Sequence, residues 1–324
     1  MNKKHFVLIL KFLVSGGLMW ILVSSFDLGT AGSRILNADP KLLGVATIIF
    51  SVQLVICVVR WRVVLTAIGG VLSFLDSFHF YLIGWFFNQA LPSSVGGDAV
   101  RIYDSYKRGL KLSCAFNSVM LERVATVFGL IIVLVIAAPF FTERVGEDKG
   151  DWILPIICIL GAAGFAGLVS LMVLDRLPLK FSRWQLVRGL AVLAADTRRV
   201  FLLPSNASKV LLWAIVGHAN VSLAVYFLGL SLKLEITWLD CLALIPPILL
   251  IMALPISIAG WGVREGVMIT AFSLIGVPIE GAFALSILFG LMGLLIALPG
   301  GVVWLMRSNK KIDNLTTFPH NKNS

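Results

Sequence analysis

The 324-residue chain is 58% hydrophobic and only 14% charged, with a mean hydropathy of +0.94 and a formal net charge of +10. Soluble domains are about 45–50% apolar and about 25% charged, so this composition excludes an ordinary soluble domain and predicts a polytopic α-helical membrane protein. The net charge does not indicate a nucleic-acid partner, because an excess of Lys and Arg in a membrane protein marks cytoplasmic loops.

The first half of the chain begins with apolar segments long enough to cross a hydrocarbon core of roughly 30 Å. Phe6–Val23 follows two lysines and is predicted to be an uncleaved span with its N-terminus in the cytoplasm. Leu42–Val59 is the second predicted span, and it ends at Arg60-Trp61-Arg62, which is typical of a cytoplasmic boundary. The third apolar segment, Phe74–Ala90, leads directly into a polar stretch rich in glycine.

This polar stretch poses a problem of topology. If Phe74–Ala90 crossed the membrane, the four basic residues that follow at 101–111 would lie outside, against the positive-inside tendency. We therefore predict a re-entrant hairpin that turns at Pro92–Gly97 and returns to the cytoplasmic side. Irregular backbone at membrane depth is tolerated only inside protein or beside a water-filled cavity, so the hairpin predicts a cavity.

A second copy of this motif stands late in the chain, at Leu254–Glu265. The offset from the first copy is 254 − 91 = 163 residues, about half of the chain. The matching positions are Leu91/Leu254, Pro92/Pro255, Ser94/Ser257, Gly97/Gly260, Val100/Val263 and Arg101/Arg264. The repeat predicts two halves, at about residues 5–150 and 152–308.

The remaining predicted segments continue this pattern. Residues 175–209 form the most basic loop, in which the sequence supports equally a short interfacial amphipathic helix and an ordinary connector. Residues 312–324 are expected to be a disordered cytoplasmic tail. The other predicted segments are the spans Cys114–Pro139, Trp152–Leu174, Val210–Leu230 and Ala282–Leu305, and a second hairpin made of Trp238–Ile258 and Gly266–Ile275.

The predicted fold is therefore an all-α polytopic membrane protein. Each half holds three spans and one hairpin, giving six full spans and two hairpins with both termini in the cytoplasm. Because three is odd, the second half is inverted relative to the first, as in many secondary transporters. Eight full spans are the alternative.

Charged residues within apolar segments mark the candidate site, because each costs about 2.5–3.5 kcal/mol at the bilayer centre. The glycines let backbone N–H groups approach a ligand, and the helix that follows each turn presents its positive end. Arg101 and Arg264 add forks that suit phosphate oxygens. The candidate substrate-binding residues are Asn88, Pro92, Gly96, Gly97, Asp98, Arg101, Glu122, Arg123, Pro255, Gly260, Gly262, Arg264 and Glu265.

A structural interpretation of the same residues stays open. Asp98 and Arg101 are spaced to pair on one helical turn. Glu122-Arg123 and Arg264-Glu265 are able to neutralise each other within each pair, or to form pairs across helices. The glycines then serve close packing. His218 and Asn220, within a predicted span, are expected to make interhelical hydrogen bonds. The four cysteines and four histidines are scattered, so the sequence predicts no metal site, disulfide framework or cofactor.

These motifs resemble the transmembrane flippase domain of the lysylphosphatidylglycerol synthase family. The residues that carry the resemblance are Asn88, Pro92, Gly96-Gly97-Asp98, Arg101, Glu122-Arg123, Pro255, Gly260, Gly262 and Arg264-Glu265, and it extends over about residues 5–307. The best-known members move an aminoacylated phosphatidylglycerol between leaflets and carry a synthase domain that is not seen after the last predicted span here. The resemblance thus implies a stand-alone member that moves a lipid, but it does not imply lysine transfer or an aminoacylated substrate.

The expected function is a lipid flippase-like translocase in a prokaryotic inner membrane. Its expected partner is an anionic or zwitterionic lipid, such as an aminoacyl, glycosyl or polyprenyl phosphate, and relatives suggest a lipid-modifying or glycosyltransferase partner. No nucleic acid is expected, and the sequence leaves the oligomeric state open. Two alternatives remain: a membrane-embedded transferase with Asp98 or Glu122 as general base, and a non-transporting scaffold.

Overall fold

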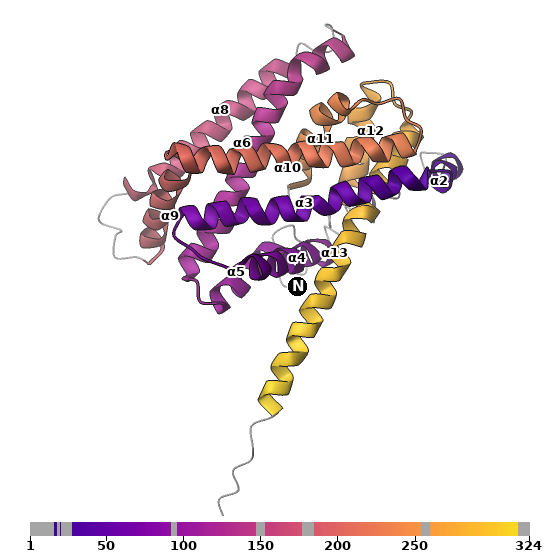
Figure 1. The fold of residues 1–324 in the computed structure, drawn as a ribbon. Helices are drawn as coiled ribbons and strands as arrows, with labels where there is room; N and C mark the ends of the chain where they lie inside the picture. The colour runs from indigo at the N-terminus through magenta and orange to yellow at the C-terminus, as the bar shows by residue number, and fades with distance from the viewer. Residues whose placement is uncertain are drawn as a thin grey trace, which may run out of the picture.

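The computed structural model describes residues 28–91, 96–146, 153–176, 185–253 and 260–316, together with Gly16, Gly17 and Trp20. Within these residues the chain forms eleven α-helices and one short 3-10 helix, without a strand (Figure 1). The predicted all-α class is confirmed. The first predicted span lies outside the described residues, apart from the three isolated residues, which are helical.

Five of the described helices are long and apolar enough to cross a membrane. Each contains or closely matches one of the spans predicted from the sequence. They are α3 (Pro40–Ala67), α6 (Leu112–Val145), α8 (Ile153–Met172), α10 (Pro204–Ser231) and α13 (Ile279–Thr316). The last helix includes the first residues of the expected disordered tail, and residues 317–324 lie outside the described part of the chain.

The predicted boundary of the second span at Arg60-Trp61-Arg62 is wrong. Helix α3 begins at Pro40, where the Asp39 side chain caps the first turn, and it continues to Ala67. Arg60 and Trp61 are 5% and 0% exposed. The Glu122 carboxylate on α6 neutralises the charge of Arg60. The positive charge therefore does not mark a membrane surface.

Two pairs of shorter helices occupy the positions of the two predicted hairpins. They are α4 (Phe74–Ala90) with α5 (Gly96–Lys107), and α11 (Trp238–Ala253) with α12 (Val263–Ser273). At 1.5 Å per residue, these helices of 17, 12, 16 and 11 residues are about 17–26 Å long, shorter than the roughly 30 Å hydrocarbon core. The helices of each pair contact one another.

Two further helices lie outside the long spans, α2 (Leu28–Leu36) and α9 (Gln185–Phe201). The basic loop therefore contains the amphipathic helix that was one of its two interpretations. Its inner face packs against α6, where Asn117 Nδ2 donates to Asp196 Oδ2 at 2.7 Å. At the surface, Arg198 donates to Asp175 at 2.6 Å and holds the pKa of that carboxyl below its usual range.

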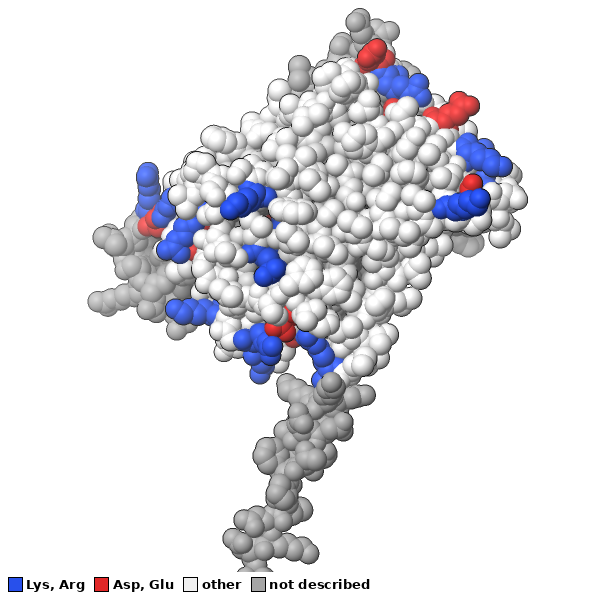
Figure 2. All heavy atoms as spheres, in the orientation of Figure 1, with Lys and Arg blue, Asp and Glu red and all other residues white. Residues whose placement is uncertain are grey.

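Helices α3 and α10 lie side by side and run in opposite directions at the centre of the molecule (Figure 1). At one end the Asp39 N–H donates to the Ser231 carbonyl at 3.0 Å, and further along Asn220 Nδ2 donates to the Ile49 carbonyl at 3.0 Å. Helix α4 packs against α13 and α11 against α6. On the face shown in Figure 2, charged side chains gather toward the ends of the helices and leave a broad, mostly uncharged surface between them.

Candidate functional site

Five charged side chains from α3, α5 and α6 form one connected network. Arg101 Nη2 donates to Asp98 Oδ1 at 3.0 Å and to Glu122 Oε2 at 2.9 Å. Arg60 Nη2 donates to Glu122 Oε1 at 2.6 Å, and Arg123 Nε donates to Asp98 Oδ2. All of them except Arg123 are buried. The network therefore joins Asp98 and Arg101 of the first motif to Glu122 and Arg123 on α6.

Among the described residues, the network contains three arginines and two carboxylates, so its formal charge is 3 − 2 = +1. Arg101 is 3% exposed, and its Nη1 is buried without a hydrogen-bond partner in the described part of the chain. A buried donor without an acceptor is unfavourable, so this nitrogen offers a place for an anionic oxygen.

Two aromatic rings, Tyr81 and Trp61, make cation–π contacts with the Arg101 guanidinium. Its Cζ lies 4.2 Å from the centroid of Tyr81 and 5.0 Å from that of Trp61, distances at which a cation is attracted to a ring face. Both rings are themselves anchored, since Tyr81 Oη donates to Glu122 at 3.1 Å and Trp61 Nε1 donates to Ser118 at 3.0 Å. The guanidinium is therefore fixed before any ligand binds.

The glycines of the first motif set the geometry of the helix pair. The Gly97 N–H donates to Asn88 Oδ1 at 2.9 Å, so Asn88 on α4 satisfies a free N–H at the start of α5. A Cβ at Gly97 would collide with the carbonyl of Gly84, which explains why glycine is needed there. The N–H of Gly97 thus binds Asn88, and a ligand is not required to satisfy it.

The second motif forms a separate, electrically neutral cluster. Arg264 Nη2 donates to Glu265 Oε1 at 2.5 Å, and Ser286 on α13 donates to the same oxygen at 3.2 Å. The Gly262 N–H donates to Glu265 Oε2 at 2.5 Å. Gly260 and Gly262 have φ of +82° and +85°, which other residues rarely adopt. The turn therefore lets the Glu265 carboxylate accept from both the Gly262 N–H and the Arg264 guanidinium.

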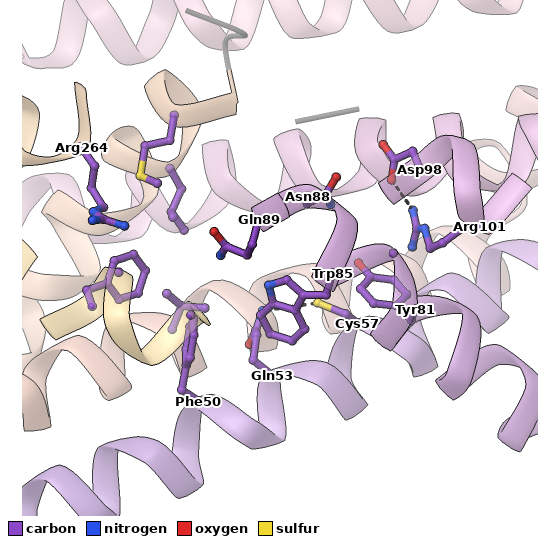
Figure 3. A pocket seen from close by; sticks show the side chains of 17 residues that line it. Phe50, Gln53, Cys57, Tyr81, Trp85, Asn88, Gln89, Asp98, Arg101 and Arg264 are labelled. Atoms are coloured by element: carbon purple, nitrogen blue, oxygen red, sulfur yellow. Dashed lines mark hydrogen bonds and ion pairs between the residues drawn. The ribbon is translucent and has the colours of Figure 1, made fainter. Parts of the chain in front are cut away.

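The arginines of both motifs border one cavity of about 280 Å³ (Figure 3). The neutral residues Trp85 and Gln89 lie between Arg101 and Arg264, and Gln53 lies below Trp85 in the view of Figure 3. A neighbouring cavity, also about 280 Å³, is bordered by Arg60, Glu122 and Arg123. The residues that line both cavities are Gln53, Tyr81, Asn88, Asp98, Arg101, Val221 and Leu249.

Most of the predicted site residues meet around these cavities. Asn88, Asp98, Arg101 and Arg264 line the first cavity, and Glu122 and Arg123 line the second. Two groups of predicted residues lie at helix starts next to the cavities. Helix α5 begins with Gly96 and Gly97, and helix α12 begins beside Gly260, Gly262 and Glu265. Pro92 and Pro255 lie outside the described residues. The expected pairs Asp98–Arg101 and Arg264–Glu265 form, whereas the Glu122 carboxylate binds Arg60 and Arg101.

Several residues of the site were not found from the sequence. The sequence pattern predicts Arg60 to be a boundary residue and does not indicate Gln53, Gln89 or Tyr81, all of which line the cavities. An amide in the middle of the apolar segment 42–59 was the available signal for Gln53. The prediction for His218 and Asn220 is confirmed, because His218 Nε2 hydrogen-bonds the Thr126 carbonyl at 2.9 Å and Asn220 donates to Gln53 Oε1 at 3.0 Å.

The model of one protein family, the lysylphosphatidylglycerol synthase TM region, matches residues 8–301, nearly the whole chain. The chain belongs to this family. Both charged clusters and both cavities lie within the matched region. No curated protein matches the chain. Membership in the lysylphosphatidylglycerol synthase TM region family, together with the five long apolar helices, identifies a multi-pass membrane protein.

Proposed function

We propose that this protein moves an anionic or zwitterionic lipid between the leaflets of a prokaryotic inner membrane. The observation that carries the proposal is the cavity bordered by Arg101 and Arg264, one arginine from each copy of the motif. Buried charges are unfavourable in a membrane and mark substrate pathways. A polar head group would pass through this cavity while the acyl chains stay in the lipid phase, and the family match supports a lipid-related role.

The proposal includes an inverted repeat of the two halves. In support, exchanging the halves reproduces the helix contacts: α4 packs on α13 as α11 packs on α6, and α5 packs on α6 as α12 packs on α13. The counterpart spans α3 and α10 run antiparallel, as inversion about an axis in the membrane plane requires. Each short helix pair would then enter from a different side, with both termini in the cytoplasm.

Cysteine labelling tests this orientation. In a cysteine-free background, we expect a membrane-impermeant maleimide added to intact cells to label Arg144→Cys and not Arg108→Cys, because α6 lies between these positions and is long enough to cross. Both sites should react once the membrane is opened. Labelling of position 108 in intact cells would contradict the proposed orientation.

The structure gives less support to a transferase. Such an enzyme would use Asp98 or Glu122 as a general base, but each of their four carboxylate oxygens already accepts a hydrogen bond from an arginine. A scaffold for a lipid-modifying or glycosyltransferase partner would bind that partner without moving lipid. Lipid movement by the purified protein therefore separates the leading proposal from both alternatives.

Reconstitution into vesicles measures that movement. Vesicles that carry a fluorescent phospholipid in both leaflets are treated with an impermeant reductant, which bleaches only the outer leaflet. We expect the purified protein to expose the inner-leaflet lipid to bleaching, in proportion to the amount of protein. An inner-leaflet pool that stays protected at every protein-to-lipid ratio would rule out translocation of that lipid.

A further inference from the structure

The acidic groups of the site are all occupied by arginine. Asp98 accepts from Arg101 on one oxygen and from Arg123 on the other. Glu122 accepts from Arg60 on Oε1 and from Arg101 on Oε2. Glu265, behind the first cavity, accepts from Arg264 and from a backbone N–H. A cationic head group would therefore find no acidic side chain among these that is not already paired.

The charge of the site favours an anion over a cation. Among the described residues, the two clusters around the cavities contain four arginines and three carboxylates, a formal sum of 4 − 3 = +1. The buried Arg101 matters most, because charges interact strongly where water is largely excluded. Its Nη1 has no hydrogen-bond partner in the described part of the chain and gives the place where the anion would bind.

The rest of the first cavity is uncharged but able to form hydrogen bonds. Gln53, Asn88 and Gln89 contribute amides, which both donate and accept. The rings of Phe50, Trp85 and Phe289 lie among them, with Phe50 packed edge-on against the other two. Figure 3 shows Gln89 and Trp85 between the two arginines. Amides beside ring faces suit a neutral group that has hydroxyls on a carbon frame.

We propose that the cavity selects a lipid phosphate whose head group is otherwise uncharged and hydroxylated, a polyol or a sugar, and that it rejects aminoacylated, cationic lipids. The phosphate binds at Arg101, and the hydroxyl groups bind the amides between Arg101 and Arg264. This inference narrows the proposed translocation to one substrate class and rests on that function. It does not extend to the acyl chains.

Competition between lipids tests this selection directly. The purified full-length protein is mixed in detergent with equal amounts of phosphatidylglycerol, lysyl-phosphatidylglycerol, phosphatidylcholine and uncharged monogalactosyl diacylglycerol, all with the same acyl chains. Native mass spectrometry then reports which lipid is retained. We expect phosphatidylglycerol to exceed each of the others by about tenfold, the effect of roughly one hydrogen bond to a charged group. Equal or greater retention of the lysyl lipid overturns the inference.

Three variants locate the selection within the cavity. Arg101→Gln removes the nitrogen that would hold the phosphate and should abolish the preference for phosphatidylglycerol. Arg108→Gln removes an arginine whose side chain is 62% exposed and should keep it. For the third variant, phosphatidic acid is added to the mixture, and the natural protein should retain more phosphatidylglycerol than phosphatidic acid, which lacks the hydroxylated group. Gln89→Leu leaves the charges in place and should remove this preference. If Gln89→Leu folds and retains that preference, the head-group assignment is wrong.

Vesicle assays with the same lipids separate this inference from the proposed function. Movement of phosphatidylglycerol but not of the lysyl lipid supports both. Selective binding of phosphatidylglycerol without movement of any lipid supports the selection and overturns translocation. Movement of the lysyl lipid at the same rate supports translocation and overturns the selection.

Discussion

Replacing Glu122 with Gln is expected to unfold much of the protein, with a loss of about 3–5 kcal/mol in the free energy of unfolding. Glu122 is 2% exposed and is the shared partner of Arg60 and Arg101. A neutral amide keeps the shape of the side chain but leaves two buried guanidinium groups facing each other without their carboxylate. Thermal unfolding of the detergent-purified variant, followed by size-exclusion chromatography, measures the effect.

Glu143→Gln is the matched control, because it makes the same change at an exposed position on the same helix. Surface substitutions of this kind usually change stability by less than about 0.5 kcal/mol. Equal melting temperatures for the Glu122 and Glu143 variants would mean that the network does not hold α3, α5 and α6 together.

Gly290→Ala is expected to impair the site while preserving the fold. A Cβ at Gly290 would overlap three atoms of the Arg264 guanidinium. Since that guanidinium is the end of a flexible side chain, it should move aside at a cost of about 1–3 kcal/mol, typical of overpacking. We expect lipid movement to fall by about tenfold or more, because a barrier change of about 1.4 kcal/mol already has that effect. Initial bleaching rates of reconstituted vesicles give this number.

Gly266→Ala provides the comparison on the neighbouring helix α12. A Cβ at Gly266 would meet no atom within 4 Å, and alanine favours a helix over glycine by about 1 kcal/mol. This variant should therefore be as stable as the natural protein and move lipid at the same rate. Similar rates for Gly290→Ala and Gly266→Ala would show that the position of Arg264 does not matter for movement.

The sequence predicted the segments of the fold better than their mutual packing. Apolar length located the five long helices, and the repeated motif located both short helix pairs, since these signals are local. The contact between α3 and α10 had no such signal, because both helices are apolar on most of their surface. The hydrogen bonds from Asp39 and Asn220 that fix their antiparallel order become visible only in the structure.

The candidate site was also predicted only in part, because the sequence shows local motifs but not contacts between distant residues. The duplication identified Arg101 and Arg264 without any knowledge of the fold. Arg60 was missed because a charge beside a Trp at the end of an apolar segment is the usual mark of a boundary, and its partner Glu122 lies 62 residues away. The contact between Gly290 and Arg264 depends on how α13 packs. The sequence of α13 contains several glycines, and nothing in it distinguishes Gly290 from the others.

The two arginines of the repeated motif provide the most direct test of lipid passage through the shared cavity. Arg101→Ala and Arg264→Ala are each reconstituted at matched protein-to-lipid ratios, after chromatography confirms folded protein, and the bleaching of inner-leaflet phosphatidylglycerol is followed. Our account predicts that both variants lose lipid movement while the surface variant Arg108→Ala retains it. Normal movement by folded Arg101→Ala and Arg264→Ala would contradict a path between the two motifs.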